Sequence, residues 1–233
     1  MDLKVLVIQN DVTENLGLYQ NFLQKKGAEI TLLKAYELNG SFPDTNNFTH
    51  FIVGPTPISA NELYKHAFLV NEWDYLSKIV RSNKPTLGVC CGGQMLAKLL
   101  GAEVVKSPKK EVGGYTVSLT NNGLTDQLFL DFPKDFPVFH WHTDMFKIPS
   151  GGKLLAKGDS YSIQAFAWQK IRGVIFHLEI DHNEAERWAV AYPSEPAAVG
   201  KTKDQVILEC IERESEMRRL AEKLIINFLN MAV

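Results

Sequence analysis

The stretch Pro85-Thr-Leu-Gly-Val-Cys-Cys-Gly-Gly-Gln94 decides the fold of this chain. An apolar, strand-like run ends at Val89, Cys90 follows on a glycine-rich turn, and a helix-forming segment then extends to Leu100. This order of strand, Gly-x-Cys-x-Gly turn and helix is typical of a nucleophile elbow, in which strained backbone exposes a reactive side chain. A helix N-terminus favours a thiolate, so we expect Cys90 to be exposed, to have a lowered pKa and to act as a nucleophile rather than as a buried structural cysteine.

The segments before the elbow alternate between strand and helix patterns. Residues 4–8, 30–33 and 50–53 are predicted to be strands, and residues 16–26 and 62–81 are predicted to be helices. Such alternation indicates an α/β fold with a doubly wound, mostly parallel, flavodoxin-like sheet flanked by helices. The site is then expected beyond the carboxyl ends of the strands, where Asn10, Asp11, Gly54 and Cys90 would lie.

The second half of the chain has a different pattern. Short strand candidates at 114–120, 138–141, 153–157, 163–168 and 173–177 are separated by turn residues, which predicts a small antiparallel extension. Residues 203–231 carry apolar side chains at helical spacing, which predicts a long C-terminal surface helix, continuous or broken once. Cys210 lies on the apolar stripe of that helix and is expected to be inert. No linker divides residues 1–233, so we expect one domain.

Composition and charge exclude several classes of protein. The formal charge of −2 over 233 residues, with acids and bases interspersed, gives no sign of nucleic-acid binding. No apolar stretch is long enough to span a bilayer, and the N-terminal residues do not have a signal-peptide pattern. Three cysteines, two of them adjacent, cannot form a disulfide framework, which indicates a reducing compartment. We therefore expect a cytoplasmic protein.

A cysteine nucleophile needs a base and a group that orients the base. The segment Gly173-Val-Ile-Phe-His-Leu-Glu179 offers both, because His177 ends an apolar strand and Glu179 points to the same side of an extended chain. A histidine at the end of a strand is by itself more often structural. Together with an elbow cysteine, however, the pair favours a catalytic triad of Cys90, His177 and Glu179.

These residues carry a resemblance. Gly88-Val-Cys-Cys-Gly-Gly-Gln94 followed by Phe176-His-Leu-Glu179 is similar to the class I glutamine amidotransferases, whose signatures are Gly-x-Cys-x-Gly-x-Gln and Phe-His-Pro-Glu. Gly54 and the proline after it fall where that family has a glycine–proline turn. The resemblance extends from about residue 5 to residue 179, and the C-terminal helix resembles that of free-standing members related to the glutaminase part of GMP synthase.

The resemblance implies a glutaminase reaction without metal or cofactor. Cys90 would attack the side-chain amide of glutamine and form a γ-glutamyl thioester, His177 would move the protons, and Glu179 would orient His177. The resemblance further implies an oxyanion hole and a glutamine pocket. The backbone N–H groups of Gly54 and Cys91 would form the first, and Gln94, Trp141 and His142 would line the second.

The sequence also departs from the family pattern. Leu178 replaces the family proline, Val53 replaces the first glycine of a Gly-Gly-Pro turn, and Cys91 replaces a commoner leucine or tyrosine. Related cysteine peptidases and stress proteins place a histidine directly after the nucleophile, and Cys91 at that position disfavours them. Because Val53 replaces the first glycine of that turn, the loop that would carry the Gly54 oxyanion donor can differ in shape.

His140, His142 and Asp144 form a competing motif. Their His-x-His-x-Asp spacing is that of a binuclear metallohydrolase, but such sites continue with another histidine, and this chain has Met145. We therefore expect no metal and assign the segment to the glutamine pocket, with packing as the alternative role of His140 and Trp141. Residues 109–111 are expected to form a solvated turn.

Three functions remain open for the chain. It hydrolyses glutamine and supplies ammonia to an acceptor or to a separate synthase subunit, it acts alone as a γ-glutamyl hydrolase, or it is a non-catalytic interaction subunit with the same fold. The intact Cys90, His177 and Glu179 favour an enzyme. The oligomeric state and the ammonia acceptor have no signature in the sequence.

Overall fold

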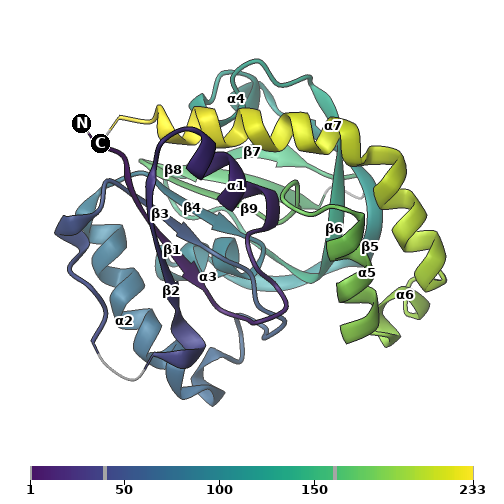
Figure 1. Ribbon diagram of the computed structural model, residues 1–233, viewed down its shortest axis with the longest axis horizontal. Helices are drawn as coiled ribbons and strands as arrows, with labels where there is room; N and C mark the ends of the chain where they lie inside the picture. Colours follow the sequence, from purple (N-terminus) through teal and green to yellow (C-terminus); the bar gives the residue numbers. More distant parts are fainter. Residues whose placement is uncertain (1, 39–40, 160–161, 233) are drawn as a thin grey trace.

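The computed structural model describes residues 2–38, 41–159 and 162–232, and within these residues nine strands form one mixed sheet (Figure 1). The strands lie in the order β2-β1-β3-β4-β9-β8-β7-β5-β6. They are β1 (Lys4–Gln9), β2 (Glu29–Lys34), β3 (His50–Val53), β4 (Thr86–Val89), β5 (Val104–Leu119), β6 (Asp135–Phe146), β7 (Lys153–Lys157), β8 (Ile163–Trp168) and β9 (Ile171–Val174).

Helices cover both faces of this sheet. They are α1 (Gly17–Lys25), α2 (Ala67–Ser82), α3 (Cys91–Leu99), α4 (Asn121–Leu124), α5 (His182–Ala191), α6 (Ser194–Ala197) and α7 (Lys203–Leu229). Short 3-10 helices are η1 (Ala35–Glu37), η2 (Thr45–Asn47), η3 (Leu63–Lys65) and η4 (Gln127–Phe129). None of the helices in the described part of the chain is long and apolar enough to cross a membrane.

The sheet has a parallel and an antiparallel half. β2, β1, β3, β4 and β9 pair in parallel, and β9 pairs with β8 in antiparallel fashion, as do the strands beyond it. Along β1, Val5 and Val7 face the core under α1 and α7, whereas Leu6 and Ile8 face the core under α2 and α3. The predicted α/β sheet with an antiparallel extension is therefore confirmed.

The antiparallel half differs most from the expectation. β5 and β6 are much longer than the predicted segments 114–120 and 138–141, and they form a hairpin with a register shift between Lys106 and Glu111. The prediction of a solvated turn at 109–111 is wrong, because Glu111 is buried and the segment belongs to β5. The length of β5 was hidden because Lys106 and Lys109 occupy exposed positions in its first half.

His177 lies three residues beyond the end of β9, so the predicted strand 173–177 is too long. After Val174 the chain leaves β4 and meets β6 instead. The His177 N–H donates to the Phe139 carbonyl at 2.8 Å, and the Phe139 N–H donates to the His177 carbonyl at 3.0 Å. This isolated bridge fixes the backbone at His177 against the antiparallel half.

The predicted C-terminal helix is α7, which is continuous over 27 residues. Its N-terminus has a capping box, in which the Thr202 hydroxyl accepts from the Gln205 N–H and the Gln205 side chain accepts from the Thr202 N–H. Cys210 lies in its buried face, as expected. α5 was not predicted, although Asp181 caps it by accepting from the Glu184 N–H.

Candidate active site

Cys90 occupies a strained turn between β4 and α3. Its backbone has φ 50° and ψ −114°, a left-handed region that non-glycine residues rarely adopt. The Cys90 N–H donates to the Val174 carbonyl in β9 at 2.8 Å, which holds the turn on the sheet. The strand–turn–helix elbow predicted for this segment is confirmed.

The glycines around Cys90 allow α3 to pack closely on the sheet. A Cβ atom on Gly92 would lie 2.1 Å from the Val53 carbonyl oxygen, and one on Gly88 would lie 2.6 Å from the Gly93 nitrogen. Both contacts are with backbone, which cannot move aside as a flexible side chain can. These glycines are therefore required by the packing of the elbow itself.

The Cys90 thiol is buried, with 6 % of the residue exposed. Burial raises the pKa of Cys90 well above its ordinary value, and the neighbouring Glu14 carboxyl raises it further. The prediction of an exposed thiol with a lowered pKa is therefore wrong for this structure, because the cost of removing a thiolate from water exceeds the effect of the helix N-terminus. Cys90 needs a base that removes its proton.

His177 and Glu179 form a buried pair that can supply that base. The His177 Nδ1 atom lies 2.5 Å from Glu179 Oε1, and Glu179 Oε2 accepts from the Leu178 N–H at 3.0 Å. The Trp188 ring packs edge-on against the imidazole, with 4.8 Å between ring centroids. In the described part of the chain, the buried His177 Nε2 atom has no hydrogen-bond partner, so its capacity to take up a proton is not used by another protein group.

The two predicted oxyanion donors differ in availability. The Gly54 N–H donates to the Ile8 carbonyl of β1 at 2.8 Å, so the prediction that it serves as a donor is wrong for this conformation. The Cys91 N–H is at the first position of α3, where helical N–H groups lack a partner within the helix. The Cys91 thiol donates to the Ile58 carbonyl at 3.2 Å.

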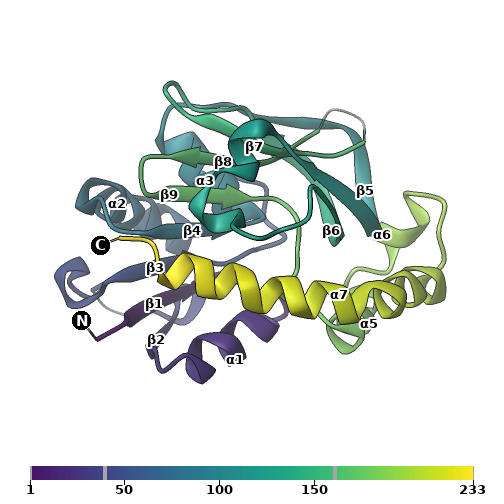
Figure 2. The same ribbon diagram turned by 90° about the horizontal axis from the view of Figure 1, so that it is seen from above.

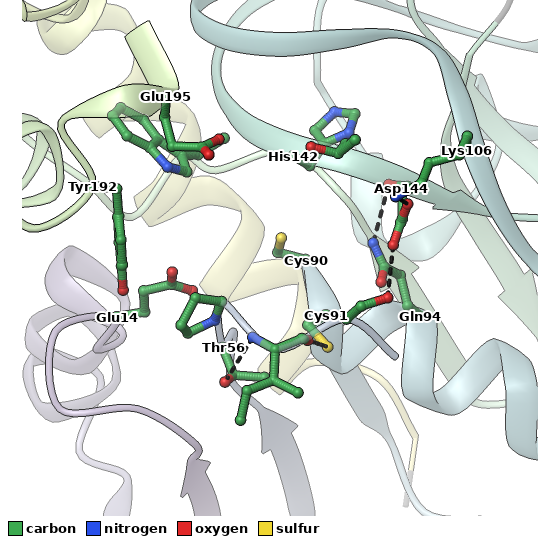
Figure 3. Close-up of a pocket in the computed structure, with 15 residues that line it drawn as sticks. Glu14, Thr56, Cys90, Cys91, Gln94, Lys106, His142, Asp144, Tyr192 and Glu195 are labelled. Atoms are coloured by element: carbon green, nitrogen blue, oxygen red, sulfur yellow. Dashed lines mark hydrogen bonds and ion pairs between the residues drawn. The ribbon is translucent and has the colours of Figure 1, made fainter. Parts of the chain in front are cut away.

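A cavity of about 280 Å³ lies above the elbow, and Figure 3 shows the side chains around it. Five residues predicted for the site line it, namely Cys90, Cys91, Gln94, Trp141 and His142. Thr143 and Asp144 also line it and belong to the segment that was assigned to the glutamine pocket. The other lining residues were not predicted for the site, and they are Glu14, Thr56, Pro57, Ile58, Ser59, Lys106, Tyr192 and Glu195.

One end of the cavity contains a cation and an anion side by side. Lys106 Nζ lies 2.7 Å from Asp144 Oδ1, and Ser59 Oγ lies 2.8 Å from Asp144 Oδ2. Gln94 Nε2 donates to the Asp144 backbone carbonyl at 3.1 Å, which connects α3 to β6. A paired positive and negative charge suits the ammonium and carboxylate of an α-amino acid. We refer to this part as the Lys106–Asp144 end.

Glu14 and Tyr192 lie at the other side of Cys90 (Figure 3). Glu14 is 5 % exposed, and burial, followed by the charge of Asp11, raises the pKa of Glu14 to about 8. The Tyr192 hydroxyl points toward the Glu14 carboxyl (Figure 3). Asp11 was expected at this edge of the sheet, but Glu14 was not. The sequence signal for Glu14 was its position three residues after Asp11.

The predicted His-x-His-x-Asp motif is divided between two environments. His140 and His142 approach Glu111, and one ligand atom from each of these three buried residues lies within 4.8 Å of the others. Asp144 instead pairs with Lys106. Glu111 Oε2 accepts from Gln164 Nε2 at 3.1 Å, and His142 Nε2 lies 3.2 Å from the same oxygen.

The fold and the thiol at its elbow define a cysteine-dependent α/β enzyme. The chain belongs to the class I glutamine amidotransferase family, because residues 7–190 match the model of that family, Glutamine amidotransferase class-I. The predicted resemblance is thereby confirmed.

Individual relatives agree with this family. The chain is 28% identical over 181 residues to the glutamine amidotransferase-like protein YfeJ of Salmonella typhimurium, with 76% of each chain covered. It is 33% identical over 148 residues to a glutamine-hydrolyzing GMP synthase subunit of Sulfolobus acidocaldarius, covering 62% of this chain and 74% of the relative. The crystal structure of a glutamine amidotransferase from Thermotoga maritima superimposes with a TM-score of 0.89 at 26% identity, covering 99% of both chains.

Proposed function

We propose that this chain, acting as one domain, hydrolyses the side-chain amide of glutamine through Cys90, His177 and Glu179. The observation that carries the proposal is the elbow thiol at the cavity together with the buried His177–Glu179 pair, whose Nε2 atom has no hydrogen-bond partner among the described residues. The Lys106–Asp144 end supports an α-amino acid as substrate, because its two charges match a zwitterion.

In this reaction the thiol proton of Cys90 passes to His177 Nε2 as Sγ attacks the γ-carbonyl carbon. The C–N bond then breaks, and nitrogen leaves as ammonia with that proton, which forms a γ-glutamyl thioester. Water attacks the thioester and gives a proton to Nε2. The C–S bond breaks, the proton returns to Sγ, and glutamate is released. Glu179 keeps Nδ1 protonated and stabilises the imidazolium in both steps.

The oxyanion formed in both steps needs hydrogen-bond donors. The Cys91 N–H is one candidate, and the Gly54 N–H becomes a second only if it leaves the Ile8 carbonyl. Because the turn at Gly54 must rearrange, binding of a separate synthase subunit could control the reaction. The same subunit would then receive the ammonia. The relative that is named as a glutamine-hydrolyzing subunit of GMP synthase supports such an arrangement.

A γ-glutamyl hydrolase that acts without a partner is the second candidate. It uses the same thioester chemistry but releases a substituted amine. The cavity favours it, because the cavity extends past Cys90 to Glu14 and Tyr192 rather than ending at the thiol.

Labelling with 6-diazo-5-oxo-L-norleucine, a glutamine analogue that alkylates the nucleophile, tests the proposal in a single turnover. Peptide mass mapping is expected to find one adduct on Cys90, blocked by L-glutamine and slowed at least about a hundredfold in His177→Ala. Cys210→Ala is the matched control, since Cys210 is buried in the face of α7 and should not affect labelling. A Cys90 that reacts with iodoacetamide but not with the analogue would contradict the proposed function.

A further inference from the structure

The cavity has two chemically different ends, and Cys90 lies between them (Figure 3). Gln94, Lys106 and Asp144 are on one side of the thiol, and Glu14 and Tyr192 are on the other. If the amino-acid group of the substrate occupies the Lys106–Asp144 end, the γ-carbonyl lies at Cys90. The leaving amine must then extend toward Glu14.

The Glu14 side of the cavity has aromatic side chains that the release of a single ammonia molecule would not require. The rings of Trp141 and Tyr192 line it, with centroids 6.3 Å apart and planes tilted by 51°. Aromatic faces attract organic ammonium groups through the ring quadrupole. The geometry of this side therefore suits a substituted amine.

Glu14 differs from the other two acids that line the cavity, because each of those is paired with a lysine. Lys110 pairs with Glu195 at 2.5 Å, and Lys106 pairs with Asp144. Among the described residues, no lysine, arginine or histidine lies within 4.0 Å of the Glu14 carboxyl, and Asp11 adds further negative potential. A buried carboxyl without a counter-ion is costly to ionise, and a cationic ligand would remove that cost.

We propose that Glu14, Trp141 and Tyr192 form a leaving-group subsite that selects γ-glutamyl amides of alkyl diamines, with the free ammonium of the leaving amine against Glu14. The inference rests on the proposed thioester chemistry and names its substrate class. Cys90 Sγ bonds to the carbonyl carbon of the γ-amide as its proton passes to His177 Nε2, the C–N bond breaks, and the diamine leaves with that proton. Water then releases glutamate and restores the thiol, so that one water is consumed per amide.

The test compares kcat/KM for three substrates, namely L-glutamine, γ-L-glutamyl-(4-aminobutyl)amide and γ-L-glutamyl-pentylamide. The last two differ only in a terminal ammonium or methyl group. The ratio of interest is kcat/KM for the aminobutyl amide divided by kcat/KM for the pentylamide. We expect this ratio to be about ten or more in the wild type, through a lower KM for the aminobutyl amide. In Glu14→Gln the ratio should fall to within about twofold of one, because the neutral amide replaces the carboxyl without changing its shape. Glu103→Gln, which alters an exposed carboxyl outside the cavity, should keep the wild-type ratio.

The outcomes distinguish failure of the leaving-group subsite from failure of the proposed glutaminase reaction. A wild type that hydrolyses glutamine but does not favour the aminobutyl amide overturns the subsite and leaves the glutaminase intact. Hydrolysis of none of the three, with no analogue adduct on Cys90, overturns the proposed function as well. Should Glu14→Gln fail to fold, Tyr192→Phe removes the hydroxyl that faces Glu14 and should lower the same ratio. An unchanged ratio in a folded Glu14→Gln variant also rejects the subsite.

Discussion

The two halves of the sheet make different contributions to the site. In the parallel half, every residue of β3, β4 and β9 is buried, whereas β5 in the antiparallel half contains buried, half-buried and exposed positions. The parallel half carries Cys90, and the antiparallel half carries Trp141, His142 and Asp144. The nucleophile thus follows a fully buried strand of the parallel half. The residues proposed to bind the substrate lie on β6, in the half whose strands are partly exposed.

His177 lies where the two halves meet. It follows β9 in sequence, but its backbone pairs with Phe139 of β6. The proposed base is therefore positioned by both halves, and the comparison predicts different results when each half is changed.

The largest effect is expected for Glu179→Gln. Loss of the carboxylate leaves the His177 tautomer and the imidazolium unsupported, which should lower kcat about a hundredfold to ten-thousandfold. Glu214→Gln is a matched control, because Glu214 makes the same type of contact with the exposed His182, 2.6 Å from its Nδ1 atom. Steady-state ammonia release measures both variants. An equal loss of kcat in Glu179→Gln and Glu214→Gln would show that Glu179 has no specific role in the mechanism. An unchanged kcat in Glu179→Gln would show the same.

A second prediction separates the packing of the two halves. Gly92→Ala places a Cβ atom 2.1 Å from the Val53 carbonyl oxygen and should lower the free energy of unfolding by about 2–3 kcal/mol. The three atoms nearest to a Cβ on Gly114 in β5 all belong to the Arg213 side chain, which can move, so Gly114→Ala should cost less than about 1 kcal/mol. Urea unfolding compares them. If both cost the same, the parallel half is no less tolerant than the antiparallel half.

The smallest effect concerns a buried acid beneath the parallel half. Burial raises the pKa of Glu72 to about 8, and its carboxyl accepts only from Asn10 among the described residues. An acid with a raised pKa in the fold stabilises the protein below the unfolded pKa near 4.5, and this contribution is lost as pH rises toward 8.

Glu72→Gln keeps the acceptor for Asn10 and does not titrate. It should therefore increase the free energy of unfolding at pH 8 by about 1–2 kcal/mol and change it little at pH 4.5. Urea unfolding at both pH values measures this, and Glu62→Gln, which changes an exposed acid, is the control. A gain of the same size at both pH values would show that ionisation of Glu72 is not its cause.

The sequence predicted short strands in both halves, and β7 and β8 of the antiparallel half were predicted with their observed bounds. Buried parallel strands are short apolar runs, so β3 was predicted with its observed bounds and the elbow with its helix. In the antiparallel half, solvent-facing lysines concealed the length of β5, and the bridge that fixes His177 depends on Phe139, which is distant in sequence.

For the site, local motifs identified the elbow thiol and the His177–Glu179 contact. Three features depended on the tertiary structure instead. The pKa of Cys90 is set by burial, the Gly54 N–H is taken by Ile8 on a neighbouring strand, and Glu14 reaches the cavity from the loop after β1. Of the three, only Glu14 has a signal in the sequence, namely its position three residues after Asp11.

α7 has a consequence for how the molecule can come apart. At about 1.5 Å per residue, its 27 residues extend roughly 40 Å, and it contacts α1 as well as β5 and β6 (Figure 2). Its apolar face is buried against elements of both halves, so detaching either half would expose that face to water. Because loss of either half would remove packing from the other, we expect the chain to unfold in a single cooperative transition, with the two sides of the cavity held together until that point.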